Sequence, residues 1–458
     1  MVLIFLVVVD RPHSTEPGIP DSDPLKFEGV WFGQVRYAMH KHRSLTIANT
    51  GQVPATVYFI DRPVGPGQDS GLCPNWVSLQ IDDGTGKLSS DTGKRTLEPG
   101  QAFNVELELR ILDVSLARAF NEGIKSLEDI LVLRVENGRD HFIPLRGTWL
   151  ESSLGHSISK LIRIPEGGIR KLQRQRPESH KHKSGSVSSG SVLSDDEASL
   201  PVRWSAPREL FRLTEVIEEL SVRVTAEWGM LNDSSTAPPW ETSAGWPFVS
   251  ASWTLRDETQ RAETLADIAE ALDTDASFDE VLPSDLTHIQ KLECLAEFLL
   301  LFLKAIPDGV VTPSLWHTLD ENLRKQEKLK ASQQASPDDL RTWAQEILSS
   351  SPSHSISFIL VTSMLDRISS EIMATIQHNH PELLPKPPPA DFSSGIPAHL
   401  RKKLPKEGKE AWRLAVMRGV AGTVAKCVVR DGEAEGGKEK ERQANEERKV
   451  RFLELFMG

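Results

Sequence analysis

The stretch FNVELELRI at residues 103–111 decides the fold class of the first third of the chain. Apolar side chains occupy every odd position of this stretch, and polar side chains occupy every even position. Because successive side chains of a strand point to opposite faces, this period of two predicts a strand with one buried face. Residues 97–100 (LEPG) precede it with proline and glycine in turn positions.

Two further pairs of apolar runs flank turn sequences. The runs are residues 44–47, 56–60, 129–135 and 141–143, and the turns are Asn49–Gly51 and Asn137–Gly138. Asn-Gly accepts the positive φ angles of a type I′ hairpin turn. Short strands separated by turns over residues 26–150 predict an immunoglobulin-like β-sandwich. Pro144 cannot donate a ladder hydrogen bond, so we expect its strand to lie at a sheet edge.

The second half has helical periodicity. The strongest pattern runs from Leu292 to Ile306, where apolar residues form one stripe (Leu292, Leu295, Leu299, Phe302 and Ile306) and further apolar residues lie beside it. A helix that is apolar nearly all round is central in a bundle. Further helices are expected at residues 338–348, 355–376, 409–430 and 446–457. The sequence therefore predicts a multidomain β plus α protein.

Composition places the boundaries between these regions. Residues 1–25 are an N-terminal segment, residues 166–203 a disordered linker rich in Ser, Gly and charge, and residues 204–458 the helical domain. Loop insertions are expected within the helical domain near 232–250, 381–405 and 431–445. The apolar run Leu3–Val9 is far below the roughly 20 residues of a spanning helix and is better interpreted as a strand.

Charge and motifs exclude several classes of function. The formal net charge of the 458 residues is -12, which argues against nucleic acid as a partner of the whole protein. Three distant cysteines exclude a disulfide framework. We find no nucleotide-binding glycine loop, no hydrolase elbow and no zinc-type spacing, so we expect no catalytic residue, no metal and no cofactor. His40 and His42 are interpreted as surface histidines.

The linker contains one candidate modification site. Ser194 precedes Asp195-Asp196-Glu197, and acidic residues on the C-terminal side suit an acidophilic kinase. An ordinary acidic linker remains the alternative. Earlier in the linker, the basic cluster Lys171–Lys183 is interpreted as a solvated spacer rather than a contact with an anionic membrane.

Several segments resemble the ASH domain of the type II inositol polyphosphate 5-phosphatases, the family of the Lowe oculocerebrorenal syndrome phosphatase. These segments are residues 47–55, 127–133, 138–147 and 153–155. The resemblance implies an ASH sandwich at residues 26–165. The second half is similar to the RhoGAP-like domain that follows ASH in that family. The similar segments there are residues 265–273, 292–307, 420–430 and 451–458.

Departures from the family patterns imply that the chain is not catalytic. Active GTPase-activating domains supply a glycine-framed arginine that neutralises charge on the transferred phosphoryl group. The equivalent region, Gly229–Thr259, contains Arg256 without that frame, and Leu300 stands about where active domains carry a lysine. The two motifs that hold Mg²⁺ and phosphate in the phosphatase domains of the family do not occur in this sequence.

The resemblance implies a targeting adaptor in membrane trafficking and signal transduction. Its expected partners are Rab and other small GTPases and endocytic adaptor proteins, through which it would be cytoplasmic and peripheral on endosome or Golgi membranes. Phe142 and Asn49 are the expected contacts, although Phe142 could equally be a core residue. Two alternatives remain: a fragment of an active phosphatase that acts in phosphatidylinositol dephosphorylation, and an active Rho GTPase-activating protein.

Overall fold

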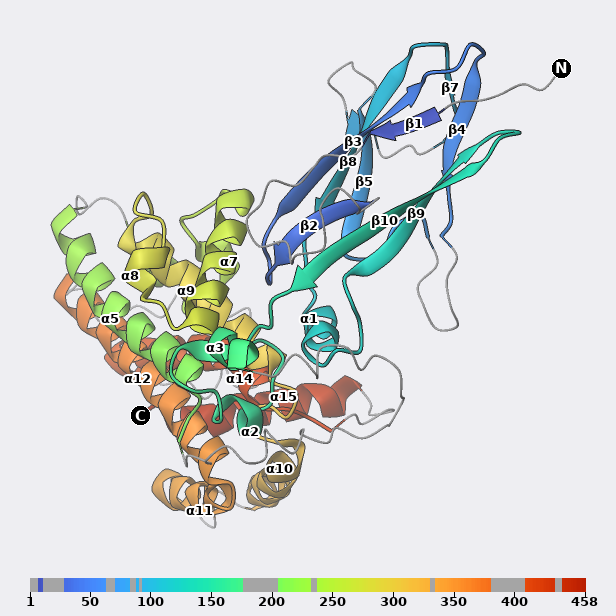
Figure 1. The fold of residues 1–458 in the computed structure, drawn as a ribbon. Coiled ribbons are helices and arrows are strands. Elements are labelled where there is room, and N and C mark those ends of the chain that lie inside the picture. The colour runs from blue at the N-terminus through green and yellow to red at the C-terminus, as the bar shows by residue number, and fades with distance from the viewer. Residues whose placement is uncertain are drawn as a thin grey trace. The chain divides into compact units, whose positions relative to one another are not determined.

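The computed structural model divides the chain into two compact units, Met1–Ser152 and Ser153–Gly458. The first is built of β-sheet and the second is mostly helical (Figure 1). This confirms the predicted order of a β domain followed by a helical region. The structure describes residues 7–10, 29–62, 71–82, 88–89, 93–175, 205–231, 237–329, 334–379, 408–432 and 439–458. Most of the predicted linker and the predicted loop at 381–405 lie outside these residues.

Two five-stranded sheets make up the β-sheet unit. The first has the order β1 (Val7–Asp10), β3 (Lys41–Asn49), β8 (Ala102–Leu109), β5 (Val77–Asp82) and β6 (Leu88–Ser89). The second has the order β2 (Val30–Val35), β10 (Asp140–Trp149), β9 (Glu128–Val135), β4 (Ala55–Ile60) and β7 (Arg95–Leu97). Neighbouring strands are antiparallel except β2 and β10, which are parallel. Helix α1 (Val114–Asn121) precedes β9.

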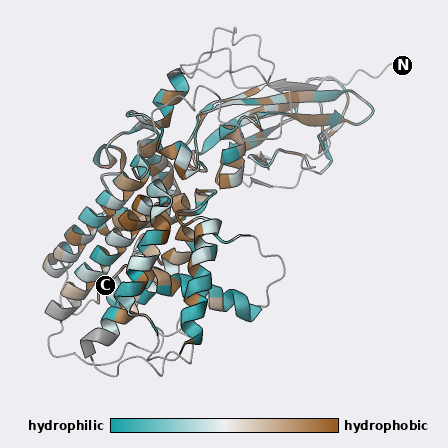
Figure 2. Cartoon of the chain, turned by 90° about the horizontal axis from the view of Figure 1, so that it is seen from below, coloured by the Kyte–Doolittle hydropathy of each residue, from teal (hydrophilic) through white to brown (hydrophobic). Residues whose placement is uncertain are grey.

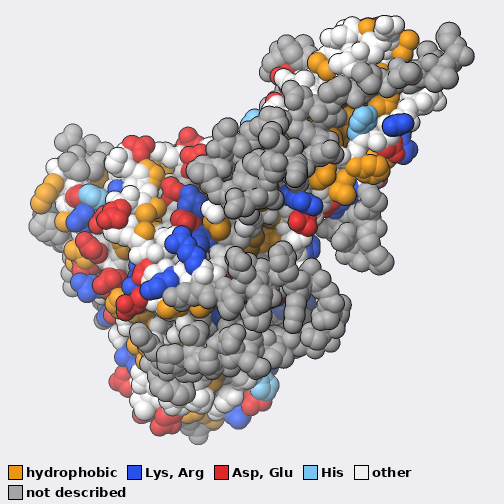
Figure 3. All heavy atoms as spheres, in the orientation of Figure 1, with side chains coloured by type: hydrophobic (Ala, Val, Ile, Leu, Met, Phe, Trp, Pro, Cys, Tyr) orange, Lys and Arg blue, Asp and Glu red, His pale blue; other side chains and the backbone are white. Residues whose placement is uncertain are grey.

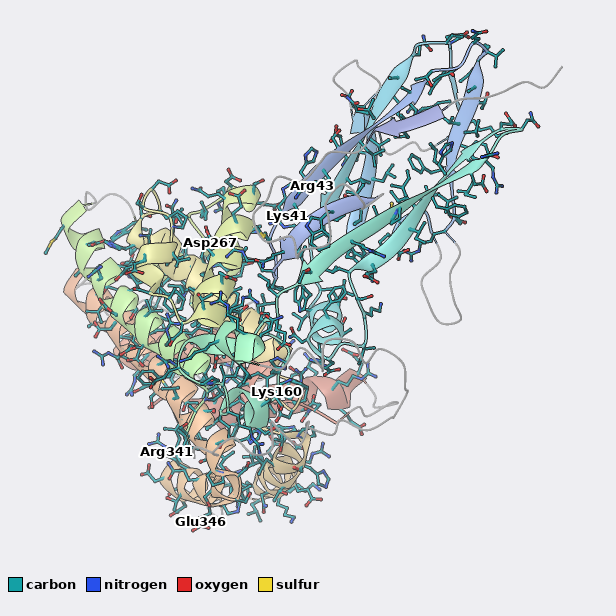
Figure 4. All side chains as sticks on the ribbon, viewed as in Figure 1. Lys41, Arg43, Lys160, Asp267, Arg341 and Glu346 are labelled. Atoms are coloured by element: carbon teal, nitrogen blue, oxygen red, sulfur yellow. The ribbon has the colours of Figure 1, made fainter. Side chains whose placement is uncertain are left out.

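The stretch at residues 103–111 behaves as its alternation predicts. All five of its odd-numbered apolar residues are buried, and the most exposed of them, Phe103, is 8% exposed. The even-numbered side chains face outward and pair across to β3, where Ser44 donates to Glu106 and Thr46 to Asn104. Arg43 on β3, labelled in Figure 4, donates from Nε to the carbonyl oxygen of Trp31 on β2 at 2.9 Å and so joins the two sheets.

The turn between β9 and β10 differs from the expected type I′ turn. Only Asn137 of the Asn-Gly pair has a positive φ, at 60°. The hairpin closes with Val135 N–H donating to the Arg139 carbonyl, so three residues separate the paired positions. The extra residue shifts the register by one, because a two-residue turn would pair the outward Phe142 with the inward Leu133.

Two further strand predictions need correction. Residues 44–47 and 56–60 do not form a hairpin, because β3 and β4 lie in different sheets and the chain crosses between the sheets at Asn49–Gly51. Pro144 lies at an edge only in part. The β10 residues that follow it pair with β2 from Leu145 onward, whereas the residues before it pair only with β9 in the described structure.

The helical unit opens with two short helices and continues as a set of long ones. Its helices are α2 (Ile158–Leu161), α3 (Gly168–Gln175), α5 (Arg208–Leu231), α6 (Pro239–Thr242), α7 (Glu258–Thr274), α8 (Phe278–Val281), α9 (His288–Ala305), α10 (Pro313–Lys328), α11 (Pro337–Ser349), α12 (Pro352–Asn379), α14 (Gly408–Val428) and α15 (Glu439–Glu454), with one 3₁₀ turn at Ser250–Ser252.

Helix α9 is the centre of this unit, as predicted. All five residues of its apolar stripe are at most 1% exposed. The helix packs against α5, α7 and α14. Figure 2 shows the apolar positions of the helical unit gathered where its helices pack on one another. On α11, Arg341 (Figure 4) donates to the carbonyl oxygens of Leu455 and Gly458 and so holds the C-terminal residues.

The structure also differs from the expected boundaries. Helix α3 occupies the start of the predicted linker, because Ile169 is fully buried and Arg170 is paired with Glu270. Helix α15 begins at Glu439, inside the loop predicted at residues 431–445. Helix α10 was not predicted, since its apolar positions are sparse among charged residues.

Candidate partner-binding site

Phe142 is an exposed aromatic residue on the outer face of the second sheet. Its side chain is 56% exposed, whereas its neighbours Ile143 and the next odd residue, Leu145, are fully buried. The alternation along β10 therefore places Phe142 on the surface. This answers the question that the sequence left open, since the side chain is free of the core and available for contact.

The pairing of the strands places other apolar residues beside Phe142. Val132 on β9 lies directly across from Phe142, and Ile60 on β4 lies directly across from Val132. One step along the sheet, Ile130 pairs with Pro144. Ile130 is 39% exposed and Val132 only 2%. We call these five residues the Phe142 patch, and Figure 3 shows apolar side chains at the surface over β9 and β10.

Polar pairs border the Phe142 patch at both ends. At one end, Arg134 donates to both carboxylate oxygens of Asp140, at 2.8 and 2.7 Å. These hydrogen bonds lower the pKa of Asp140. At the other end, Arg146 lies 3.8 Å from Glu128. An apolar centre with a charged rim is the usual composition of a surface that binds another protein.

The backbone of β10 offers a further contact next to the patch. Gly147 N–H donates to the Leu127 carbonyl, so the odd residues of β10 are those that hydrogen-bond with β9. The N–H and C=O of Phe142 therefore point to the opposite side. Among the described residues no strand pairs with that side before Leu145. An edge of this kind can accept a strand from a partner.

Asn49 lies in the interior and does not belong to the Phe142 patch. Asn49 is 1% exposed. Its side-chain amide donates to the carbonyl oxygens of Val53 and Leu97 at 2.8 and 2.9 Å. Its Oδ1 accepts from Gly51 N–H at 2.9 Å. The Asn49 side chain therefore stabilises the turn by which the chain passes from one sheet to the other. Any effect of Asn49 on binding would be exerted through that turn.

The remaining candidates are widely separated. Ser194 lies outside the described residues. His42 Nε2 is 2.7 Å from Glu106 and His40 Nε2 is 4.0 Å from Glu108, both on the first sheet. Within the described ranges, no group of three or more His, Cys, Asp or Glu side chains could hold a metal ion. Nor does any helix in them have the length and apolar character to cross a membrane.

A buried carboxylate fixes the loop that precedes Arg256. Glu293 on α9 accepts from Trp246 Nε1 at 3.1 Å and from the N–H and hydroxyl of Thr254 at 2.7 and 2.9 Å. Burial raises the pKa of Glu293. Arg256 follows two residues after Thr254 and is exposed. The loop thus carries an exposed arginine next to residues that are hydrogen-bonded to the buried Glu293.

A Ser, His and Asp chain occurs where α12 begins. Ser351 Oγ is 2.8 Å from His354 Nδ1, and Asp308 Oδ2 is 3.2 Å from His354 Nε2. In serine hydrolases the serine contacts Nε2 and the acid contacts Nδ1. The reversed order, and the position of Ser351 just before the helix, indicate a network that caps α12.

The sequence singled out Phe142 and Pro144 among the residues of the Phe142 patch, and it did not single out Ile60, Ile130 and Val132. The alternation of β9 marks Ile130 and Val132 as members of one face. The register of the β9–β10 hairpin is needed to know that this face also carries Phe142. A two-residue turn at the Asn-Gly pair would predict a register that is shifted by one residue.

Comparison with known proteins supports the assignment of the β-sheet unit. Residues 25–149 match the family described as "Inositol polyphosphate 5-phosphatase OCRL-like, ASH domain". The mouse (Mus musculus) protein "Type II inositol 1,4,5-trisphosphate 5-phosphatase" is 26% identical over 291 residues. The alignment covers 63% of this chain but only 23% of the mouse protein. The β-sheet unit is therefore an ASH domain of the OCRL-like kind, and the chain is similar to the type II inositol polyphosphate 5-phosphatases.

Proposed function

We propose that this chain is a non-catalytic targeting module that captures membrane-anchored Rab GTPases through the Phe142 patch. The observation that carries the proposal is the exposure of Phe142, at 56%, beside a stretch of the β10 edge with which no described strand pairs. An aromatic side chain at the centre of an apolar patch is the residue type that dominates binding energy in protein interfaces. Similarity to this family supports the targeting role, and it does not identify the GTPase.

The finer architecture is part of the same proposal. We interpret the two packed sheets as an immunoglobulin-like sandwich and the helical unit as a RhoGAP-like bundle that binds further small GTPases and endocytic adaptor proteins. Through such partners the chain would be cytoplasmic and peripheral on endosome or Golgi membranes, with a part in signal transduction. The match of the mouse relative beyond the ASH domain, over 291 residues in all, supports common descent of at least part of the helical unit.

The test is the Phe142→Asp variant. Binding to a panel of GTP-loaded and GDP-loaded Rab proteins is measured by calorimetry or surface plasmon resonance. We expect the dissociation constant for the captured Rab to rise at least ~30-fold, because removal of an interface hot spot costs ~2 kcal/mol or more. The melting temperature should change little, since substitutions at exposed positions usually alter stability by less than ~0.5 kcal/mol.

The matched control is Ile124→Asp. Ile124 is 72% exposed and lies after α1 in the same unit, so it gives the same change of charge outside the patch. Capture by this variant should equal that of the wild type. Retained capture by Phe142→Asp, or an equal loss in the Ile124→Asp variant, would refute the assignment of the patch.

A second candidate follows from the name of the mouse relative, which is an inositol trisphosphate 5-phosphatase. The chain aligns with only 23% of that protein, so the same module could serve a phosphatase that acts in phosphatidylinositol dephosphorylation. The genomic sequence upstream of Met1 tests this. An open reading frame with the two phosphatase motifs would favour the enzyme, and a stop codon in frame would favour a free-standing adaptor.

A further inference from the structure

Buried charges tie the start of the helical unit to the end of α7. Arg170 on α3 lies 2.6 Å from Glu270 and 3.5 Å from Asp273. Ser153 donates from its N–H and from its hydroxyl to Asp273 Oδ1, both at 2.7 Å. Asp273 is 1% exposed and Arg170 is 6% exposed. These contacts hold residues 153–170, which we call the junction segment, against α7 (Figure 1).

A second carboxylate at the end of α7 connects the junction segment with α5. Asp275 accepts from the N–H of Gly167 at 3.1 Å. The same carboxylate lies 2.7 Å from Arg208 and 3.2 Å from Arg212, both in the first turns of α5. The junction segment, α5 and α7 therefore meet at one charged cluster.

Glu209 is the group in this cluster without a counter-charge of its own. It is 2% exposed, and its Oε2 has no hydrogen-bond partner among the described residues. Four carboxyl groups face three guanidinium groups here: Glu209, Glu270, Asp273 and Asp275 against Arg170, Arg208 and Arg212. Burial is the largest cause that raises the pKa of Glu209 to about 7, and the negative charge of Asp273 contributes to this rise.

We propose that Glu209 makes the junction segment a proton-sensitive latch, closed while the Glu209 carboxyl is protonated and loosened when it ionises. Ionisation adds a fourth negative charge beside Asp273 in a site closed to water, where such a charge is costly. When the latch opens, the carboxyl releases its proton to solvent and becomes hydrated. The inference does not involve Phe142 and stands apart from the proposed function.

The sign of the effect follows from linkage. Glu209 has a pKa of about 7 in the closed latch, and a hydrated glutamate has a pKa of ~4.3. The closed form therefore binds the proton more tightly, and its advantage is complete below the pKa of the open form. That advantage is lost as the pH rises through the pKa of the closed form. The latch thus opens toward alkaline pH.

The other titratable groups nearby either would give a pH dependence of the opposite direction or are already paired. His156 lies on the junction segment and is 3% exposed. Protonation of a histidine adds positive charge toward acid, so an effect of His156 would have the opposite direction. Helices α9 and α12 also pack on α5. On α9, Glu293 accepts hydrogen bonds from Trp246 and Thr254, and Glu297 is paired with Arg261. On α12, Arg367 is paired with Glu218.

Amide hydrogen exchange of the full chain tests the latch. Protection factors, corrected for the intrinsic pH dependence of exchange, are compared for residues 158–170 at about pH 5.5 and about pH 8, where linkage predicts a fall of ~10-fold or more in the wild type. In Glu209→Gln the protection should be high at both pH values. The matched control Glu215→Gln, an exposed acid on the same helix, should behave as the wild type.

Three outcomes would overturn the proposal: constant protection in the wild type, protection that falls toward acid, or an unchanged pH dependence in Glu209→Gln. Circular dichroism at both pH values shows whether the variants are folded. If Glu209→Gln does not fold, the wild-type pH series decides alone, because a midpoint near neutral pH with loss of protection on the alkaline side supports Glu209. The opposite direction points to His156.

Discussion

The replacement of Asn49 by alanine separates a structural role from a direct contact. The Asn49 side chain makes three hydrogen bonds: two donated to the carbonyl oxygens of Val53 and Leu97, and one accepted from Gly51. In Asn49→Ala all three are lost in a site that is 1% exposed. A buried polar group left without a partner costs ~1–3 kcal/mol, so we expect a loss of ~2–4 kcal/mol in the free energy of unfolding of the ASH domain.

Calorimetric melting of the full chain measures this loss. A change of this size lowers the melting temperature of a domain of about this length by on the order of 10 °C. The matched control is Gln52→Ala in the same turn, which removes an exposed amide and should alter stability by less than ~0.5 kcal/mol. Rab capture by Asn49→Ala, measured well below its melting temperature, should remain within a few-fold of the wild type. A loss of capture with stability unchanged would show that Asn49 contacts the partner and that its interior placement is wrong.

Three changes in the helical unit have distinct expected outcomes. Gly168→Ala should destabilise this unit by more than ~2 kcal/mol, because the φ of Gly168 is +73° and an added Cβ would lie 2.2 Å from the Asp273 carbonyl oxygen. Chemical denaturation measures this loss of stability, and an unchanged stability would contradict the packing of α3. Glu293→Ala should cost ~3–5 kcal/mol by leaving Trp246 and Thr254 without an acceptor, whereas Glu293→Gln should cost clearly less; equal losses would show that hydrogen bonding is not the reason. Arg256→Ala should leave GTP hydrolysis by Rho-type proteins at its intrinsic rate, as the wild type does; acceleration by the wild type that is lost in Arg256→Ala would instead establish a GTPase-activating protein.

Strand faces were predictable from the sequence because the pattern of burial along a strand has a fixed period. The odd residues of 103–111 are buried as their alternation predicts, whereas the sequence left the face of Phe142 open and the structure places it outward. Long apolar helices were predictable for a similar reason, and the stripe on α9 is buried throughout. In both cases a single element carries the whole signal, so no knowledge of its neighbours is required.

The remaining features depend on contacts between distant residues. The register of β9 and β10 follows the packing of their apolar faces, and this overrode the turn preference of Asn137–Gly138. Helix α3 is basic and nearly devoid of apolar residues, so it was interpreted as part of a linker. It is held by the ion pair of Arg170 with Glu270, which is 100 residues away and has no local signature.

The position of Pro144 connects the fold of the ASH domain with the candidate site. Pro144 and Phe142 are two residues apart, so their backbone groups point to the same side of β10, the side on which β2 pairs further along. Because proline has no N–H, the ladder with β2 cannot extend through this position by a donor from β10. In the described part of the chain the pairing begins at Leu145, and no described strand pairs with the N–H and C=O of Phe142. The missing donor at Pro144 thus favours an end of the ladder at this position, two residues from the exposed aromatic ring of Phe142.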